Sequence, residues 1–459
     1  MLASDGETRR GSDFIHLTFK HELSQKSPLY SLLQHLGFLN FFVGDDDLTC
    51  DKDYKHIFKR FRNLFVRPRG VTLNHRRITP DTITNQFKVE GLSPDHIQSL
   101  FNPDDKQDVK MALDMLKDIW SLSRASQSTN FNQRFLDNRE ALWILGKFLF
   151  HLVFPYLCID LSLSEQVEHL SAAAHLALAL YKQASKEFIP TGLYVDLMIM
   201  IKNIIFCIAK AKVDDLDGEF FPIQLGTDRL EELFRILRTM VGNDANVDML
   251  QLVSRLSGTT EVANILAKYP HWDSSPRRLK FNALTRESKE IPDSADHSKP
   301  PSWRGNARLK NVSLQTSWNW GRRLVKEECE VVKPILEELE KAGADILSPF
   351  FFIFRMIQMT SMRALKTHMI HWKRTLKMQP FELKLRMPFW QNKLMRRTRL
   401  KELQLNVGIL KKALSLMVSK YPKLMHFLNS AKQENLSVQQ IASNESRRLG
   451  DMVPSTPTS

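Results

Sequence analysis

An aspartate cluster that runs directly into a basic helix carries the clearest chemical potential in this sequence. Five aspartates lie between Asp45 and Asp53, and the stretch that follows carries His56, Lys59 and Arg62. Carboxylate oxygens are the ligands that Mg²⁺ prefers, and nearby cations can face the phosphate groups of a substrate. Acidic residues followed by basic ones therefore suggest a metal ion beside a phosphate.

A second carboxylate, Glu231, lies on a distant predicted helix. Asp53 and Glu231 together suit a Mg²⁺-dependent phosphoryl-transfer site, in which the two carboxylates should lie within roughly 8 Å of each other. The same residues have an ordinary interpretation, because Asp53 can cap a helix and Glu231 can pair with Arg235 on its own helix. Spacing alone leaves both interpretations open.

The elements that position Asp53 are a predicted strand and a predicted helix. Residues 39–43 form an apolar run that Gly44 and the aspartates end, which indicates a strand. Residues 54–66 then show helical spacing of their apolar residues, which are Ile57, Phe61, Leu64 and Phe65. Asp53 is therefore expected at a strand-to-helix corner, with the basic side chains projecting nearby.

Further along the chain, the pattern is mainly helical. Residues 79–211 carry several segments with helical apolar spacing, and many of these begin at a capping Ser, Thr or Asp. A capped helix is predicted over 227–241, a Pro-rich and Ser-rich linker over 273–305, and one long helix, kinked at Pro334, over 317–347. The sequence predicts a helical block between Asp53 and Glu231.

Composition narrows the class of protein. The chain has 459 residues, of which 43% are hydrophobic and 25% charged, so it can bury a sizeable core. Four dispersed cysteines fit neither a disulfide framework nor a zinc site, and the N-terminus shows no signal peptide, which favours a cytosolic or nuclear protein. Two long apolar stretches are interrupted by polar residues, so buried helices, not membrane spans, are expected.

The net charge of +14 belongs to the C-terminal quarter of the chain. Residues 351–459 carry 20 Lys and Arg against 5 Asp and Glu. Three interpretations stay open: basic amphipathic helices that bind DNA, a solvated basic tail without a specific function, or an incorrect reading frame from about Phe351.

Two motifs resemble those of one family, the P-element-type (THAP-associated) DNA transposases. The first resembles the D-x-x-H-x-x-K-x-x-R-N signature at the second catalytic aspartate, with its positions at Asp53, His56, Lys59, Arg62 and Asn63. The second resembles the segment D-x-x-E-x-x-F-x-x-x-R that carries the third acidic residue, with its positions at Asp228, Glu231, Phe234 and Arg238. The resemblance covers roughly residues 45–279 and extends more weakly to about residue 349.

The resemblance implies a fold that is α+β and mostly helical. It would contain a partial RNase H-like core interrupted by an α-helical insertion, with a basic helical C-terminal tail. The implied parts are the first core segment (1–78), the insertion (79–222), the return to the core (223–280), a linker and long helix (281–349) and the tail (350–459). The insertion binds GTP in at least one family member, but the G-x-x-x-x-G-K-[ST] phosphate-binding pattern is absent here.

The resemblance also implies a function. It suggests a nuclear, transposase-derived DNA-binding protein, able to form a homo-oligomer, in which Asp53 and Glu231 hold Mg²⁺. His56, Lys59, Arg62 and Arg238 would then contact nucleic acid.

One feature departs from the family. Its first catalytic aspartate lies on a strand well before the second, whereas only 52 residues precede Asp53 here and no suitable strand is predicted among them. Neither Asp13 nor the aspartates of 45–47 suit that position. We therefore expect an inactive remnant of a Mg²⁺-dependent transposase or nuclease, and the alternative is a non-catalytic helical protein-interaction or scaffold module on the same fold.

Overall fold

The computed structural model describes residues 2–4, 14–102, 104, 106–124, 131–239, 248–269, 283–290 and 300–348. These residues all belong to the first of two units of the chain, Met1–Lys366. The predictions for the basic tail (350–459) lie outside the described residues, as does most of the expected linker over 273–305.

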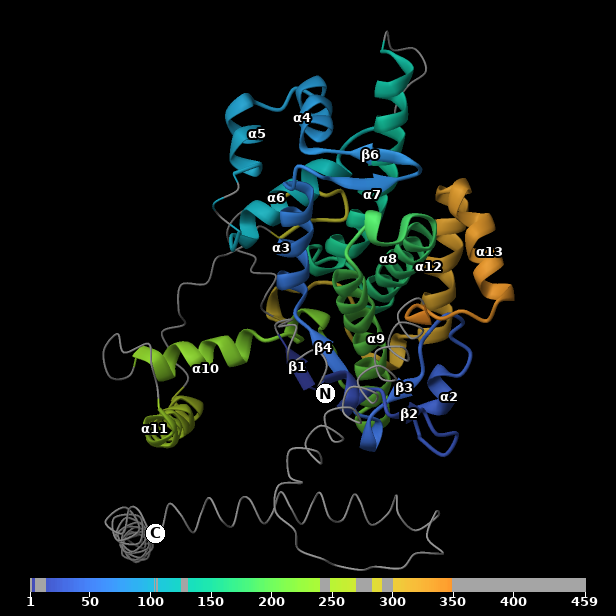
Figure 1. Ribbon diagram of the computed structural model, residues 1–459. Helices are drawn as coiled ribbons and strands as arrows, with labels where there is room; N and C mark the ends of the chain where they lie inside the picture. The colour runs from blue at the N-terminus through green and yellow to red at the C-terminus, as the bar shows by residue number, and fades with distance from the viewer. Residues whose placement is uncertain are drawn as a thin grey trace, which may run out of the picture. The chain divides into compact units, whose positions relative to one another are not determined.

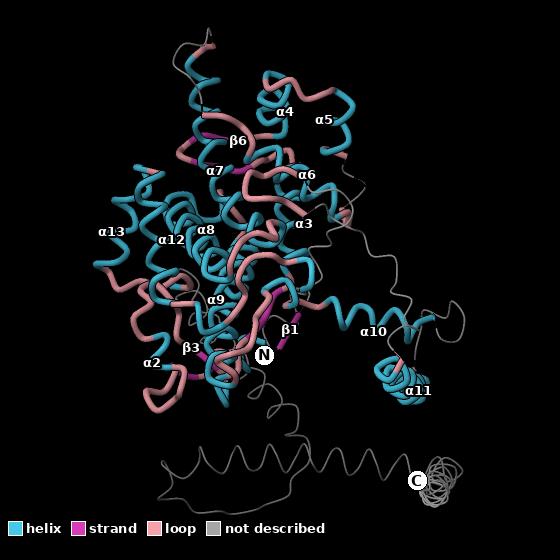
Figure 2. Tube along the Cα trace, turned by 180° about the vertical axis from the view of Figure 1, so that it is seen from behind, coloured by secondary structure: helices cyan, strands magenta, loops and turns pink. Residues whose placement is uncertain are grey.

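The described chain is mostly helical and contains short two-stranded sheets (Figures 1 and 2). The strands are β1 (Leu2–Ser4), β2 (His21–Glu22), β3 (Phe42–Val43), β4 (Cys50–Lys52), β5 (Val71–Leu73) and β6 (Arg76–Ile78). β1 pairs with β4 in parallel, whereas β2 pairs with β3 and β5 with β6 in antiparallel fashion. A mostly helical α+β fold is therefore confirmed, and the RNase H-like core stays a prediction.

The helices follow one another with short connections. Their bounds are α2 (Tyr30–Leu33), α3 (Tyr54–Phe65), α4 (Pro80–Val89), α5 (Pro94–Leu100), α6 (Val109–Trp120), α7 (Gln133–Leu157), α8 (Leu163–Ala184), α9 (Thr191–Asp214), α10 (Asp228–Thr239), α11 (Met249–Lys268), α12 (Leu314–Glu328) and α13 (Lys333–Lys341).

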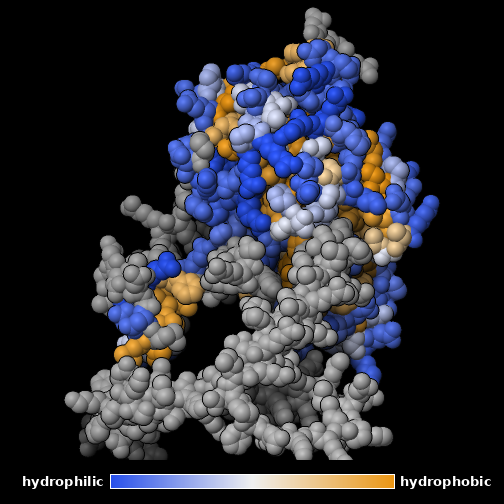
Figure 3. Space-filling view, viewed as in Figure 1, coloured by the Kyte–Doolittle hydropathy of each residue, from blue (hydrophilic) through white to orange (hydrophobic). Residues whose placement is uncertain are grey.

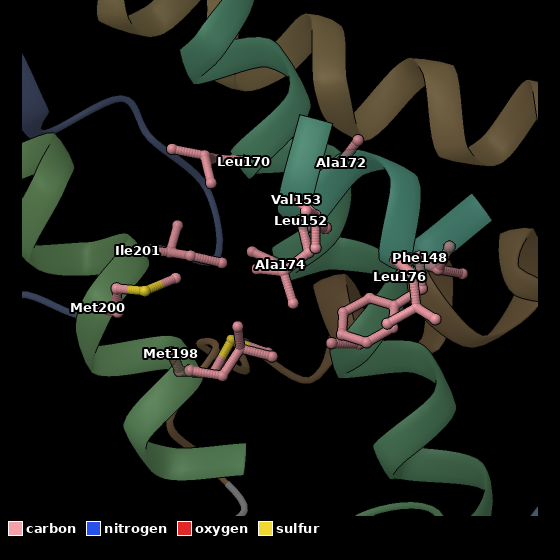
Figure 4. Packing of buried hydrophobic residues seen from close by; sticks show 14 of the residues in the cluster. Phe148, Leu152, Val153, Leu170, Ala172, Ala174, Leu176, Met198, Met200 and Ile201 are labelled. Atoms are coloured by element: carbon pink, nitrogen blue, oxygen red, sulfur yellow. The ribbon is translucent and has the colours of Figure 1, made fainter. Parts of the chain in front are cut away.

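The centre of the core is formed by α7, α8 and α9, whose apolar side chains interlock in Figure 4. α7 and α9 are long and apolar enough to cross a membrane by length and composition, but 78% and 83% of their apolar windows are buried inside the protein. Such burial is typical of core helices that are apolar on all sides. α8 contributes small residues, among them Ala172, Ala173 and Ala174, which let its neighbours approach closely.

α12 packs closely against α8 because Gly321 lies at their contact. A Cβ atom at this position would lie 2.3 Å from the carbonyl oxygen of Glu168, so a larger residue would push the helices apart. Trp318, one turn earlier on α12, is fully buried and donates its indole N–H to the carbonyl of Gly37 at 2.7 Å. These contacts attach α12 to both the central helices and the N-terminal segment.

Apolar side chains are also exposed on α10 and α11, where Figure 3 shows an orange patch beside the otherwise largely hydrophilic described surface. On α11 these residues are Leu250, Val253, Leu256, Val262 and Ile265. On α10, Phe234 is 50% exposed although it was expected on the buried face, whereas Leu237 is buried as expected.

Two predicted elements have different bounds from those expected. The strand expected over 39–43 is only β3, and the strand that leads to Asp53 is β4. Between them, Asp45–Asp47 form a single 3₁₀ turn in which Asp46 and Asp47 have positive φ angles of 54° and 55°. Asp tolerates this left-handed conformation better than most residues, which explains how an aspartate run can form so tight a turn.

The single long helix predicted over 317–347 is wrong, because the chain forms α12 and α13 with a 3₁₀ turn at Glu330–Val332 between them. Pro334 lies in the first turn of α13. Proline lacks the N–H that a helix interior requires but fits a first turn, so it begins a new helix here. In contrast, the helix predicted over 54–66 is confirmed as α3, with the expected residues on its buried face.

The first prediction concerns His175, which is fully buried on α8 with Nδ1 2.7 Å from the carbonyl oxygen of Ser171. Burial lowers the pKa of His175 from 6.5 to about 3. The unfolded chain therefore takes up a proton below pH 6.5 that the folded chain takes up only near pH 3, so stability is lost as the pH falls through this window. Each pH unit should cost about 1.4 kcal/mol through this one group.

The test is urea unfolding of the wild type and of His175→Gln between pH 7 and pH 5. The variant should show a shallower loss of unfolding free energy on acidification, because glutamine does not titrate. Parallel curves for the two proteins would contradict the assignment of this acid sensitivity to His175.

Candidate metal site

Three side chains from two distant segments converge beside the end of β4. Asp53 and His56 come from the start of α3, and Glu231 comes from the first turn of α10. Each offers one ligand atom, and these atoms all lie within 4.8 Å of one another. The expected proximity of Asp53 and Glu231 is therefore confirmed, while their role as metal ligands stays a prediction.

Asp53 is held in place by three hydrogen bonds. It is only 2% exposed, and its Oδ1 accepts from the backbone N–H of Lys55 at 2.8 Å, which caps α3. Its Oδ2 accepts from both the backbone N–H and the hydroxyl of Thr227, at 2.9 and 2.8 Å. A carboxylate offers about four lone-pair positions, so these bonds leave about one for a cation. Asp53 can therefore cap the helix and still contribute one bond to a metal ion.

A second buried carboxylate, Asp51, holds the residue before Thr227. Its Oδ2 accepts from the backbone N–H of Gly226 at 2.8 Å. Burial raises the pKa of Asp51 to about 7; the bond from Gly226 opposes this shift and the negative charge of Asp53 adds to it. Because Asp51 and Asp53 are two residues apart at the end of β4, both can reach the same segment.

Gly226 is required at this point for two reasons. Its φ angle is +109°, which side-chain-bearing residues rarely adopt, and a Cβ atom would lie 2.9 Å from the carboxylate of Asp53. The pair Gly226 and Thr227 was missed in the sequence, although a glycine followed by a threonine directly before a predicted helix is a recognisable signal of a tight connection.

His56 and Glu231 form the more exposed half of the site. His56 Nε2 lies 3.2 Å from Glu231 Oε1, and the two side chains are 28% and 58% exposed. The Thr227 hydroxyl lies 3.4 Å from the same Glu231 oxygen. One imidazole and two carboxylates form a donor set that suits a divalent transition ion, and without such an ion the same atoms form a hydrogen-bonded pair.

The other residues expected at a nucleic-acid surface are placed differently from one another. Lys59 lies one turn after His56 on α3 and donates to Gln107 Oε1 at 3.1 Å. Arg238 is exposed on α10, two turns after Glu231. The prediction for Arg62 is wrong: its side chain is buried, and its guanidinium donates to the carbonyl oxygens of Leu100 and Asn102.

The acidic residues upstream of Asp53 also need a correction. A strand does lie beside β4, because β1 pairs with it in parallel, with Ser4 opposite Lys52. The expectation that no such strand precedes Asp53 is therefore wrong. Asp5, which follows β1 in the sequence, and Asp13 lie outside the described residues.

The aspartates of the 3₁₀ turn make their contacts elsewhere. Asp45 forms an ion pair with Lys20, and Asp47 accepts a hydrogen bond from the hydroxyl of Ser27 at 2.6 Å. Neither belongs to the group of ligand atoms around Asp53.

Comparisons with known proteins give a single distant likeness to report. No protein-family model matches the sequence, and no curated protein matches it. Among solved structures, the chain is similar to one from the Drosophila P element transposase strand transfer complex, with a TM-score of 0.34 and 16% sequence identity. The match covers 46% of this chain and 52% of that chain, so it spans about half of the transposase. A likeness this weak does not by itself establish the fold or the function.

The second prediction tests what holds α10 to β4. Thr227→Val keeps the shape of the side chain but removes the hydroxyl that donates to Asp53. Loss of a buried bond to a charged group should lower the unfolding free energy by about 1–3 kcal/mol and should speed amide hydrogen exchange in α10. Thr260→Val, in which an exposed hydroxyl contacts only its own helix, is the matched control. Exchange in α10 that is equal in both variants would argue against this attachment.

Proposed function

We propose that this chain is a DNA-binding protein of transposase descent that holds a divalent cation between Asp53, His56 and Glu231. The observation that supports this most strongly is the convergence of the two motif segments, since His56 and Glu231 are 175 residues apart in the sequence and 3.2 Å apart in space. The two motifs that resemble those of P-element-type transposases are the two segments that meet there.

The donor set supports a preference among metal ions. Mg²⁺ usually takes oxygen ligands, whereas Mn²⁺ also accepts an imidazole nitrogen. With His56 as the third ligand, the site should bind Mn²⁺ more tightly than Mg²⁺. A bound ion would supply a Lewis acid for a phosphate oxygen. The chain's own part is to hold the carboxylate of Asp53 in position through Thr227.

Two exposed cations support DNA as the partner. Lys59 is three residues from His56 on α3, and Arg238 is seven residues from Glu231 on α10, so each lies on the same helical face as its ligand. Such residues can contact backbone phosphates without reading the base sequence. The proposed location is accordingly the nucleus.

Binding without strand transfer is the proposed outcome. In-line displacement at a two-metal site needs carboxylates for both ions, and the candidate cluster among the described residues contains two. The rival proposal is a scaffold module without a metal ion. It is favoured by the hydrogen bonds of Asp53, which on their own form a sound structural attachment. Metal binding distinguishes the two proposals.

The third prediction is that purified protein binds Mn²⁺ at one site, measured as the loss of the free Mn²⁺ signal in electron paramagnetic resonance. Glu231→Gln should weaken binding by at least about tenfold, because it removes a charged ligand while leaving the contacts between Asp53 and Thr227 in place. Glu338→Gln, an exposed glutamate on α13, should bind as the wild type does. Equal affinity in Glu231→Gln and the wild type would favour the scaffold proposal.

The fourth prediction concerns the salt dependence of DNA binding. Each phosphate contact contributes about 0.9 to the slope of log K against log salt concentration. Lys59→Gln and Arg238→Gln should each reduce the magnitude of this slope by about 1 in fluorescence anisotropy with duplex DNA. Lys182→Gln, remote in sequence from both motif segments, is the control.

A chain that ends at Ser348 separates the contribution of the tail. It lacks the 20 Lys and Arg of residues 351–459, so it should lose most non-specific affinity if these residues bind DNA. Unchanged binding after this truncation would remove the tail from the proposed function, and unchanged slopes in both point variants would remove the motif segments.

A further inference from the structure

A second candidate site lies where α7, α8 and α12 meet, and it shares no residue with the metal site. It is a cavity of about 270 Å³ that opens to the surface. Its principal walls are Phe150 and Phe154 of α7, Glu165, Glu168 and His169 of α8, and Trp320 of α12. Because these residues recur at helical spacing, each helix presents one face to the cavity.

The walls of the cavity are mainly aromatic. Phe150 and Phe154 stack with ring centroids 4.6 Å apart, and the ring of His169 meets both edge-on at 5.3 and 5.4 Å. Trp320 is 44% exposed, and the guanidinium of Arg323 lies 4.0 Å from its ring centroid. This ring therefore already accepts one cation, as the negative face of an indole should.

The charges around the cavity leave one carboxylate without a cation. Glu165 is paired with Arg286, which also lines the cavity. Glu168 has no ion-pair partner among the described residues, and its nearest polar contact is the Ser317 hydroxyl at 3.5 Å. The lining therefore carries a net negative charge from Glu168, because the charges of Glu165 and Arg286 cancel.

The neighbouring imidazole does not neutralise this charge. Burial lowers the pKa of His169 to about 3, with the adjacent His151 adding to the effect, so His169 is uncharged at neutral pH. Its Nδ1 lies 2.9 Å from Nδ1 of His151, which fixes the ring. Burial also raises the pKa of Glu168, and the charge of Glu165 adds to this rise. A cation bound in the cavity would relieve the unfavourable environment of the Glu168 carboxylate.

We propose that this cavity binds the ammonium or guanidinium group of a lysine or arginine side chain from a basic peptide. Aromatic faces around one uncompensated carboxylate suit a monocation that carries an apolar stem. The volume is below the range of about 300–1,000 Å³ for drug-sized ligands, so it fits a ligand the size of a side chain. The exposed Trp320 at the rim provides a surface for the flanking peptide. This inference does not rest on the metal site.

The test is isothermal titration of the full chain with the peptides Ac-Gly-Arg-Gly-NH₂, Ac-Gly-Lys-Gly-NH₂ and the neutral Ac-Gly-Gln-Gly-NH₂. At least one basic peptide should bind saturably, and the neutral peptide should not. Spermidine is titrated in parallel. Saturable binding of spermidine without binding of either peptide would overturn the assignment to a peptide side chain.

Two variants locate the binding. Glu168→Gln keeps the shape of the cavity and should weaken peptide binding by at least about tenfold, while Trp320→Leu should weaken it about threefold to fivefold. Glu327→Gln, an exposed glutamate on the same helix as Trp320, is the matched control and should bind as the wild type does. Unfolding curves verify that each variant is folded. Absence of saturable binding by both basic peptides, or equal binding by Glu168→Gln and the wild type, would overturn the proposal.

Discussion

The attachment of Gly226 and Thr227 to the two carboxylates at the end of β4 is the constraint on which the candidate metal site depends. Asp51 and Asp53 accept three hydrogen bonds from this two-residue segment. The bonds are buried and involve carboxylate groups, so each contributes more than an ordinary surface contact. They fix the start of α10, and one turn later Glu231 reaches His56. Without them, nothing in the first turn of α10 would hold Glu231 near α3.

β4 itself is fixed by charges on its other residues. Lys52, between the two aspartates, lies 3.3 Å from Asp196 of α9, and Asp196 also pairs with Arg60 of α3. Both Lys52 and Asp196 are largely buried, and burying charges is tolerated only when they are paired and hydrogen-bonded. The strand, α3 and α9 are therefore joined by one polar network, and Asp53 inherits its position from that network.

Sequence reasoning found the local elements more readily than the connections between them. α3 follows from the helical spacing of its apolar residues, and the N-cap role of Asp53 follows from residue type. Spacing alone left Glu231 an ordinary helix glutamate, and only the motif resemblance paired it with Asp53. Hydrogen bonds between Thr227 and Asp53 join residues 174 positions apart, and no local pattern encodes such a contact. Arg62 shows the reverse error: a basic residue in a motif was expected at the surface but is buried, because backbone carbonyls after α5 take up its donors.

The most direct test of the central claim is a crystal structure of the protein grown with Mn²⁺, with diffraction measured at the manganese absorption edge. The account predicts an anomalous peak coordinated by Asp53, His56 and Glu231, with Thr227 still donating to Asp53. A structure in which the carboxylates of Asp53 and Glu231 lie more than about 8 Å apart, or in which the manganese peak lies elsewhere, would contradict it.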